Sequence, residues 1–367
     1  MKMCYVGKNL KQCGIGNIFK NDVCAFVTLG HEVQTIDTTI QEFELSQIDP
    51  DVELVLVSAD VEAAQKIGQS NKLKKTLLFI HGRADGNFDP QEYVNYSALK
   101  LMAQLNSISQ TIGFAKATSY LWSKLKRAFS FQGDSYRGVN LYWLNAIRRF
   151  QSVVVPSNLF GNQLKHSLGI NYWKIPYGLD HSYWKPDKDY TTCEEHVRII
   201  IPTGFFLFKR LNIGLRKINY VIKELEEKIC VEADFIWYNA DLKELKDKIQ
   251  ECYPNITFKD GTSDPKKLFS KYDLVAHPSL GDTVPQTVVE CCALGLPVLA
   301  STLSEDCIGS HLLHIRTTDP GYEDALRMLI LNAELRLELS KRARSFARKW
   351  IGWEDRARMI LELGRNI

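Results

Sequence analysis

The sequence predicts an α/β protein that is built from two doubly wound parallel sheets. Its 367 residues are about twice the length of a common domain, so a single core is not expected. Short strand-like runs alternate with helix-length amphipathic stretches along the chain, which is the pattern of parallel α/β layers. The composition, with 45% hydrophobic and 24% charged residues, is ordinary for a globular protein and excludes disorder and low-complexity repeats.

The first series of elements occupies the amino-terminal half of the chain. Its expected strands are residues 3–6, 31–36, 53–57, 76–80 and 153–156. Its expected crossover helices are residues 16–29, 61–68 and 158–168. We therefore predict an amino-terminal domain over residues 1–182, with an inserted helical, basic region at about residues 85–150.

A second series follows a polar segment at residues 183–195, which contains a proline and lacks periodicity. Its expected strands are residues 198–202, 233–237, 256–258, 274–276 and 297–300, and its expected helices are residues 211–227, 242–252, 265–270 and 285–294. We predict a second domain over residues 183–345, and a cleft between the two domains. Ligands of such sheets bind beyond the carboxyl ends of the strands, so the loops there are the candidate site.

The net charge of +3 is unevenly distributed. Residues 100–149 hold eight basic residues and one acid, so this segment carries +7 and the rest of the chain −4. Such a concentration predicts an anionic partner, and the alternative is a basic surface kept for solubility. Aromatic residues stand among these cations, so residues 116–149 suit peripheral contact with an anionic membrane. A nucleic acid is the less favoured partner, because no nucleic-acid-binding motif accompanies them.

Several classes of protein are excluded by what the sequence lacks. It has no apolar run of membrane-spanning length and no signal-peptide pattern at its start. Its nine cysteines are odd in number and contain no CxxC, so neither a disulfide framework nor a zinc ribbon fits them. We expect a cytoplasmic location, with a peripheral membrane location as the alternative.

Two loops could hold a phosphate. Gly14 and Gly16 follow the first strand and open a helix, whose free amides can meet an anion. A complete dinucleotide fingerprint would need a third glycine where Phe19 stands, which disfavours a nicotinamide oxidoreductase without removing it as an alternative. At the head of the second domain, a strand runs through Gly204 to Lys209 and Arg210, two cations that could neutralise a phosphate.

The strongest signal is the segment HPSLGDTVPQTVVECCALGLPVLAS at residues 277–301. A strand ends there, a loop containing Gly281 and Pro285 follows, and a helix leads to the next strand. Asp282 in the loop and Glu290 in the helix could both face a ligand at the amino end of that helix. The adjacent pair CC at residues 291–292 is expected to pack on the sheet and not to bind metal.

This segment resembles the donor-binding signature of the retaining glycosyltransferases of family four, in which an acid, seven residues and a glutamate precede a small-residue stretch. Four other segments resemble the same family in order: CGIGNIFKNDVCAFVTLGHEV, LLFIHGR, VVVPSNLFGNQL with IPYGLDHSYWKP, and SFARKWIGWEDRARMILEL. The resemblance implies the GT-B fold, in which two Rossmann-like domains face a cleft. It also implies that the helix at residues 346–367 crosses back to the amino-terminal domain.

The resemblance implies a retaining hexosyltransferase that uses a UDP- or GDP-sugar as donor, needs no metal or other cofactor, and acts on a glycan or lipid-linked acceptor. Glu290 would hold the ribose hydroxyls, and Asp282 the hydroxyls of the donor sugar. Lys209, with Arg210, would neutralise the diphosphate, and His81 would lie near the transferred sugar. The remaining implied substrate-binding residues are Gly14, Gly16, Gly204, Gly281, Thr283, Val284, Pro285 and Thr287.

One further alternative is a catalytically weak or inactive GT-B scaffold that binds a sugar nucleotide or an anionic partner. The family usually has glutamate at the position of Asp282, and arginine at the position of Phe205. Glu290→Ala and Lys209→Ala would separate the two hypotheses, because only an enzyme has turnover to lose.

Overall fold

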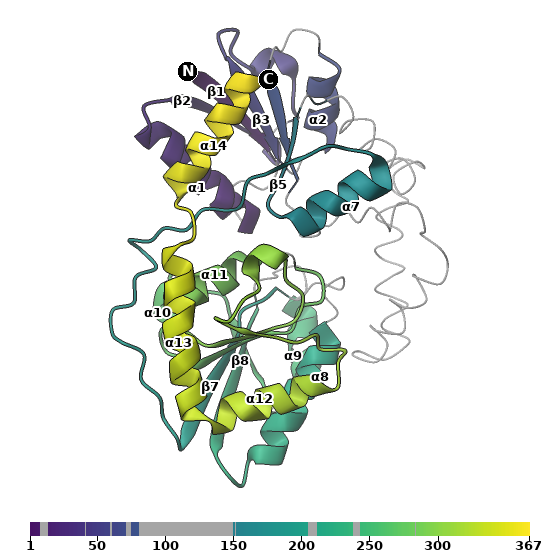
Figure 1. Cartoon of the computed structure of the whole chain (residues 1–367). Helices are drawn as coiled ribbons and strands as arrows, with labels where there is room; N and C mark the ends of the chain where they lie inside the picture. Colours follow the sequence, from purple (N-terminus) through teal and green to yellow (C-terminus); the bar gives the residue numbers. More distant parts are fainter. Residues whose placement is uncertain are drawn as a thin grey trace. The chain divides into compact units, whose positions relative to one another are not determined.

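The computed structural model describes residues 1–7, 14–40, 42–58, 61–70, 75–80, 150, 152–204, 211–237, 243–282 and 284–367. The described residues divide into two compact units (Figure 1). The first holds those up to residue 80, residues 150–178 and Ile351–Ile367, and the second holds Leu179–Trp350. Residues 85–149 of the expected insertion lie outside the described residues.

The first unit contains a six-stranded parallel sheet in the order β2-β1-β3-β4-β5-β6. Its strands are β1 (Lys2–Gly7), β2 (Glu32–Asp37), β3 (Leu54–Ser58), β4 (Thr76–Phe79), β5 (Ser152–Val155) and β6 (Trp173–Lys174). Its helices are α1 (Gly14–Thr28), the 3-10 helix η1 (Leu45–Gln47), α2 (Val61–Gly68), α7 (Asn158–Leu168) and α14 (Trp353–Asn366). The expected strands and crossover helices are confirmed within one or two residues. The edge strand β6 was not predicted, because two residues are too few to show a period.

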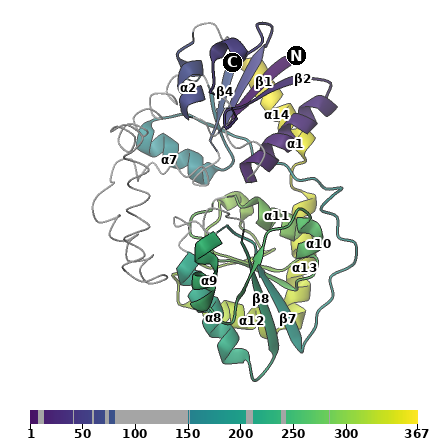
Figure 2. The same cartoon turned by 180° about the vertical axis from the view of Figure 1, so that it is seen from behind.

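Alternation along the strands sends side chains to two separate cores. On β1, Cys4 and Val6 join the core that contains residues of α2 and α7. Met3 and Tyr5 join the opposite core, which contains residues of α1 and α14. Both faces of the sheet are therefore covered, which is why its inner strands β3, β4 and β5 are largely apolar and buried (Figures 1 and 2).

The carboxyl-terminal segment is divided into two helices instead of the single one that was expected at residues 346–367. Helix α13 (Ala333–Arg348) ends inside this segment, and α14 begins after Gly352, whose extended backbone is the amino-terminal cap. Only α14 belongs to the first unit, where Ile360 and Leu363 are buried in the core. The return of the last helix to the amino-terminal unit is thus confirmed.

A buried ion pair anchors α14. The Arg356 guanidinium donates to both carboxylate oxygens of Asp22 on α1, at 2.7 and 3.1 Å, and both side chains are at most 1% exposed. Arg356 also donates to the carbonyls of Ile175 and Pro176, each at 2.9 Å. One side chain therefore joins α14, α1 and the segment that leads out of the first unit.

The second unit contains another six-stranded parallel sheet, in the order β12-β11-β10-β7-β8-β9. Its strands are β7 (His196–Ile201), β8 (Cys230–Trp237), β9 (Thr257–Asp260), β10 (Leu274–His277), β11 (Val298–Ala300) and β12 (Leu313–His314). Its helices are α8 (Leu211–Leu225), α9 (Lys243–Glu251), α10 (Pro265–Phe269), α11 (Gln286–Ala293), the 3-10 helix η5 (Glu305–Cys307), α12 (Gly321–Leu331) and α13. The expected elements are confirmed, whereas β12, α12 and α13 were not predicted.

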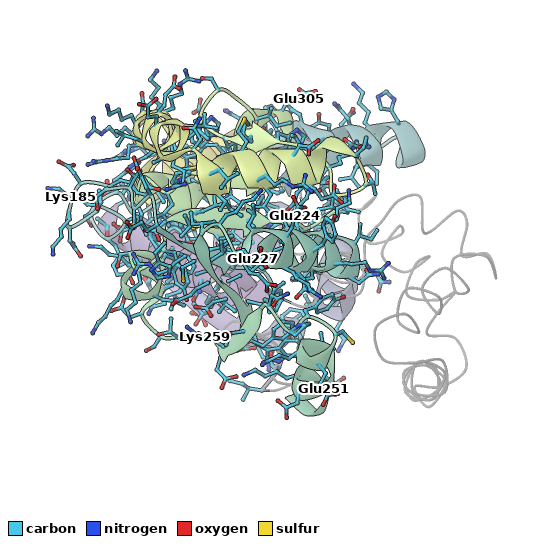
Figure 3. All side chains as sticks on the ribbon, turned by 90° about the horizontal axis from the view of Figure 1, so that it is seen from below. Lys185, Glu224, Glu227, Glu251, Lys259 and Glu305 are labelled. Carbon is cyan, nitrogen blue, oxygen red and sulfur yellow. The ribbon has the colours of Figure 1, made fainter. Side chains whose placement is uncertain are left out.

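Helices cover both faces of this second sheet. Helices α8, α9 and α12 contribute to the core on one face, while α10, α11 and α13 lie on the other (Figures 1 and 2). An ion pair between Arg327 on α12 and Glu224 on α8, at 2.7 Å, ties two helices of the first group together at the surface, where Figure 3 shows Glu224 with Glu227. No helix in the described part of the chain is long and apolar enough to cross a bilayer.

The polar segment expected to join the domains is an ordered part of the second unit, which begins at Leu179. Trp184 is buried and stacks on Phe269 of α10, with ring centroids 6.0 Å apart. Further along, the Tyr190 hydroxyl donates to the carbonyl of Asp273 at 2.6 Å. The lack of periodicity here reflects an irregular segment, with a turn at residues 181–184, that is held by side-chain contacts.

Candidate functional site

The strand order of the second unit singles out one place on its sheet. The chain proceeds outward from β7 to β9, and then returns to start β10 on the other side of β7. The loops after β7 and β10 therefore leave the sheet in opposite directions. Open α/β sheets bind their ligands at such a topological switch point, beyond the carboxyl ends of the strands.

Most of the predicted donor-site residues of this unit lie at the switch point. The loop after β7 reaches Gly204, and the loop after β10 leads into α11. The predicted residues that the structure places at this edge are Gly204, Gly281, Asp282, Val284, Pro285, Thr287 and Glu290. Residues far apart in the chain thus meet at one edge because β7 and β10 are adjacent.

Two hydrogen bonds hold the loop after β10 in place. The Ser279 hydroxyl accepts a hydrogen bond from the Gly281 amide at 3.2 Å, and the Ser279 carbonyl accepts one from the Thr302 amide at 3.1 Å. Pro285, with φ near −70°, is the cap from which α11 starts. The loop is therefore fixed at the sheet edge, with the amino end of α11 at the same place.

Asp282 lies beside a histidine that the motif did not identify. His277, the last residue of β10, has its Nε2 atom 3.4 Å from Oδ2 of Asp282. The histidine side chain is 1% exposed, and that of Asp282 is 11% exposed. The sequence signal that could have indicated this contact is the short spacing between a strand end and an acid in a tight loop.

Glu290 stands on α11 among apolar neighbours. The adjacent Cys291 and Cys292 are fully buried, as expected for side chains that pack on the sheet. Burial raises the pKa of the Glu290 carboxyl to about 8. Carboxyls with strongly raised pKa values are concentrated at functional sites, since a folded protein gains no stability from such a group.

Tyr183 is a second residue near the candidate site, close to Glu290, that the sequence pattern did not indicate. Its hydroxyl donates to Asp264, the cap of α10, at 3.1 Å, and its side chain is 39% exposed. Burial of part of the ring raises its pKa, and the negative charges of Asp264 and Glu290 add to the effect. Tyr183 therefore lies within electrostatic range of Glu290.

Close packing between α8 and the loop after β10 depends on a glycine. A Cβ atom at Gly214 would collide with Pro278, and it would come within 3.0 Å of Thr317. Gly214 therefore lets the first turns of α8 approach the loop that carries Asp282.

Other predicted site residues are not brought to this edge. His81, Lys209, Arg210 and Thr283 lie outside the described residues. Gly14 and Gly16 occupy the first turn of α1, in the other unit. Among the residues that the structure describes, no group of three His, Cys, Asp or Glu side chains is placed to hold a metal ion.

Comparison with protein families assigns the second unit. Residues 205–332 match the family model described as glycosyl transferases group 1, a stretch that includes the Asp282 loop and α11. Residues 205–332 are thus similar to a glycosyl transferases group 1 domain. A search of the curated proteins with the whole sequence found no match.

Solved structures resemble this chain over nearly its whole length. A sucrose-phosphate synthase from Thermosynechococcus elongatus is 14% identical, with a TM-score of 0.69, and the match covers 100% of this chain and 98% of that one. The Anabaena protein HepE, solved in complex with UDP, is 13% identical, with a TM-score of 0.66 and complete coverage of both chains. The match to S. aureus TarM has a TM-score of 0.60 at 15% identity, and covers 87% of this chain but 56% of TarM. Together with the two parallel sheets, these likenesses confirm the expected GT-B fold.

Proposed function

We propose that this glycosyltransferase moves a hexosyl group from a nucleotide diphosphate sugar to an acceptor hydroxyl, with retention of the anomeric configuration. The observation that carries the proposal is the pair of acids, Asp282 and Glu290, at the switch point of the unit that matches the family. A related fold has been solved with UDP and with UDP-glucose, in the case of HepE, which supports a nucleotide-sugar donor.

Each acid has a role that follows from its chemistry. A carboxyl group exchanges hydrogen bonds with hydroxyls whether it is ionised or protonated, so Glu290 would bind the ribose hydroxyls and Asp282 the hydroxyls of the donor sugar. Lys209, with Arg210, would neutralise the diphosphate. The amino end of α11 adds a partial positive charge at the same place, which favours an anion.

The reaction breaks the bond between the anomeric carbon and the diphosphate oxygen, and forms one from that carbon to the acceptor oxygen. Positive charge grows on the sugar and negative charge on the departing diphosphate, where Lys209, Arg210 and the α11 dipole would stabilise it. The acceptor proton passes to an oxygen of the leaving phosphate. Because these cations supply the counter-charge, we propose a reaction that does not depend on a metal ion.

A glycan or lipid-linked acceptor is the proposal for the second substrate, from the +7 charge of residues 100–149. Sedimentation with liposomes tests the membrane contact directly. We expect binding to vesicles that contain anionic lipid and none to neutral vesicles. Absence of binding to both would remove the membrane from the proposal and leave a soluble glycan.

The donor is tested with a panel of UDP-, GDP- and ADP-sugars, by thermal shift and by release of the nucleoside diphosphate. We expect one donor class to raise the melting temperature and to be turned over. Glu290→Ala should lose both effects, while the exposed control Glu227→Ala should keep them. Binding without turnover across many acceptors would favour the inactive scaffold instead.

A further inference from the structure

His277 is held at the end of β10 by backbone pairing and by burial of its side chain. Its carbonyl accepts a hydrogen bond from the Ser301 amide at 3.0 Å, and its Cα is paired with Ala300 of β11. Its side chain is 1% exposed, so the imidazole ring has no freedom to swing into solvent. The ring is therefore a fixed part of the floor beneath the loop after β10.

The loop after β10 turns back so that the Asp282 carboxylate lies next to the buried imidazole ring. The hydrogen bond between the Ser279 hydroxyl and the Gly281 amide closes a tight turn, after which Oδ2 of Asp282 lies 3.4 Å from Nε2 of His277. Hydrogen bonds at catalytic sites are often long before a ligand is bound and tighten afterwards. The 3.4 Å contact does not have hydrogen-bond geometry in this structure, so it would orient the carboxylate once ligand binding tightens it.

The surroundings of the ring favour one tautomer. Only a proton on Nε2 can be donated towards Asp282. Within the described part of the chain the Nδ1 atom is buried and has no hydrogen-bond partner, so a proton there would be a buried donor without an acceptor, at a substantial desolvation cost. Both considerations place the proton on Nε2, facing the carboxylate.

We propose that His277 is a positioning residue for the donor sugar: its Nε2–H group orients the Asp282 carboxylate, and that carboxylate binds the sugar. The proposal rests on the proposed function, in which Asp282 contacts the sugar part of the donor. A carboxylate that is already oriented loses less freedom when the ligand binds, so removal of the histidine donor weakens sugar binding. The diphosphate and nucleoside do not depend on Asp282 and should be unaffected.

Two substitutions separate positioning from structure. The amide nitrogen of glutamine reaches about as far as Nε2 of histidine, whereas that of asparagine ends nearer to the position of Nδ1. His277→Gln therefore keeps a donor towards Asp282, and His277→Asn removes it. Calorimetric titrations with UDP and UDP-glucose, and with GDP and GDP-mannose, measure what the sugar adds to binding in each variant.

We expect His277→Asn to weaken binding of the sugar nucleotide about tenfold, which is the effect of losing one hydrogen bond to a charged group, with the Kd for the free diphosphate within about twofold of wild type. His277→Gln should restore most of the loss. In Asp282→Ala, the addition of His277→Asn should cost nothing more, because the two residues act through one contact.

Three results would overturn the inference, and they differ from failure of the proposed function. Equal weakening of UDP and UDP-glucose by His277→Asn would make the residue structural. No effect of His277→Asn, or additive losses in the double variant, would remove the coupling to Asp282. If the wild-type protein binds none of the four probes, the proposed use of a UDP- or GDP-sugar donor is wrong, and the inference falls with it.

Discussion

Replacement of Glu290 by glutamine should stabilise the protein at alkaline pH while it weakens donor binding. Burial raises the pKa of this carboxyl from its usual value of 4.5 to about 8. The folded state therefore binds a proton more tightly than the unfolded chain, and the stability of the folded protein falls as the pH rises from 4.5 to 8. Glutamine cannot ionise, so the variant escapes this loss.

The size of the effect follows from the width of that pH window. Each pKa unit corresponds to about 1.4 kcal/mol, so the full shift is worth about 5 kcal/mol at most. The Glu290→Gln protein should match wild type in stability near pH 4.5, and exceed it by up to that amount at pH 9. Residual contact of the carboxyl with solvent reduces the difference below this upper bound.

The assay is urea denaturation of both proteins at a series of pH values, with Glu227→Gln as the control. Glu227 is an exposed carboxyl of the same unit, in the turn after α8 (Figure 3), so its replacement should not change the pH dependence. If the free energy of unfolding changes with pH in the same way for wild type and Glu290→Gln between pH 5 and 9, the reasoning is refuted. If Glu290→Gln also loses nucleotide-sugar binding, the carboxyl that lowers stability at high pH is also the one that binds the donor.

Three further predictions concern the fold and the reaction. Arg356→Met leaves its aspartate partner buried without its counter-charge, so we expect urea denaturation to show a free energy of unfolding lower by about 3–5 kcal/mol. The exposed control Arg358→Met should lower it by less than about 1 kcal/mol, and equal effects of the two substitutions would contradict the prediction. Gly214→Ala should force the loop after β10 to move, which should weaken UDP binding about tenfold and lower the free energy of unfolding by about 1–3 kcal/mol. The control Gly321→Ala adds a methyl group in open space and should change neither UDP binding nor stability. Release of the nucleoside diphosphate should continue at an unchanged rate in excess EDTA, and loss of activity that Mg²⁺ or Mn²⁺ restores would show a metal requirement.

The positions of the strands and crossover helices could be predicted because their signals are local. Alternation of apolar residues and the lengths of apolar runs depend only on near neighbours in the chain, and the bounds of the expected elements were found within three residues. Asp282 and Glu290 could be singled out as candidates for the same reason, since their spacing around one loop and one helix is itself a local pattern. Short edge strands such as β6 and β12 carry no such pattern.

The order of the strands, the break before Gly352 and the partners of the site residues were decided only by tertiary structure. Neighbouring strands are separated in sequence by whole helices, so nothing local states that β7 lies beside β10. The pKa of Glu290 and the contact of Asp282 with His277 likewise arise from how the chain surrounds each group. The local sequence therefore determined which residues are candidates for chemistry. Packing determined the protonation state and the orientation of their side chains, because desolvation and hydrogen-bond geometry depend on atoms that only folding brings near.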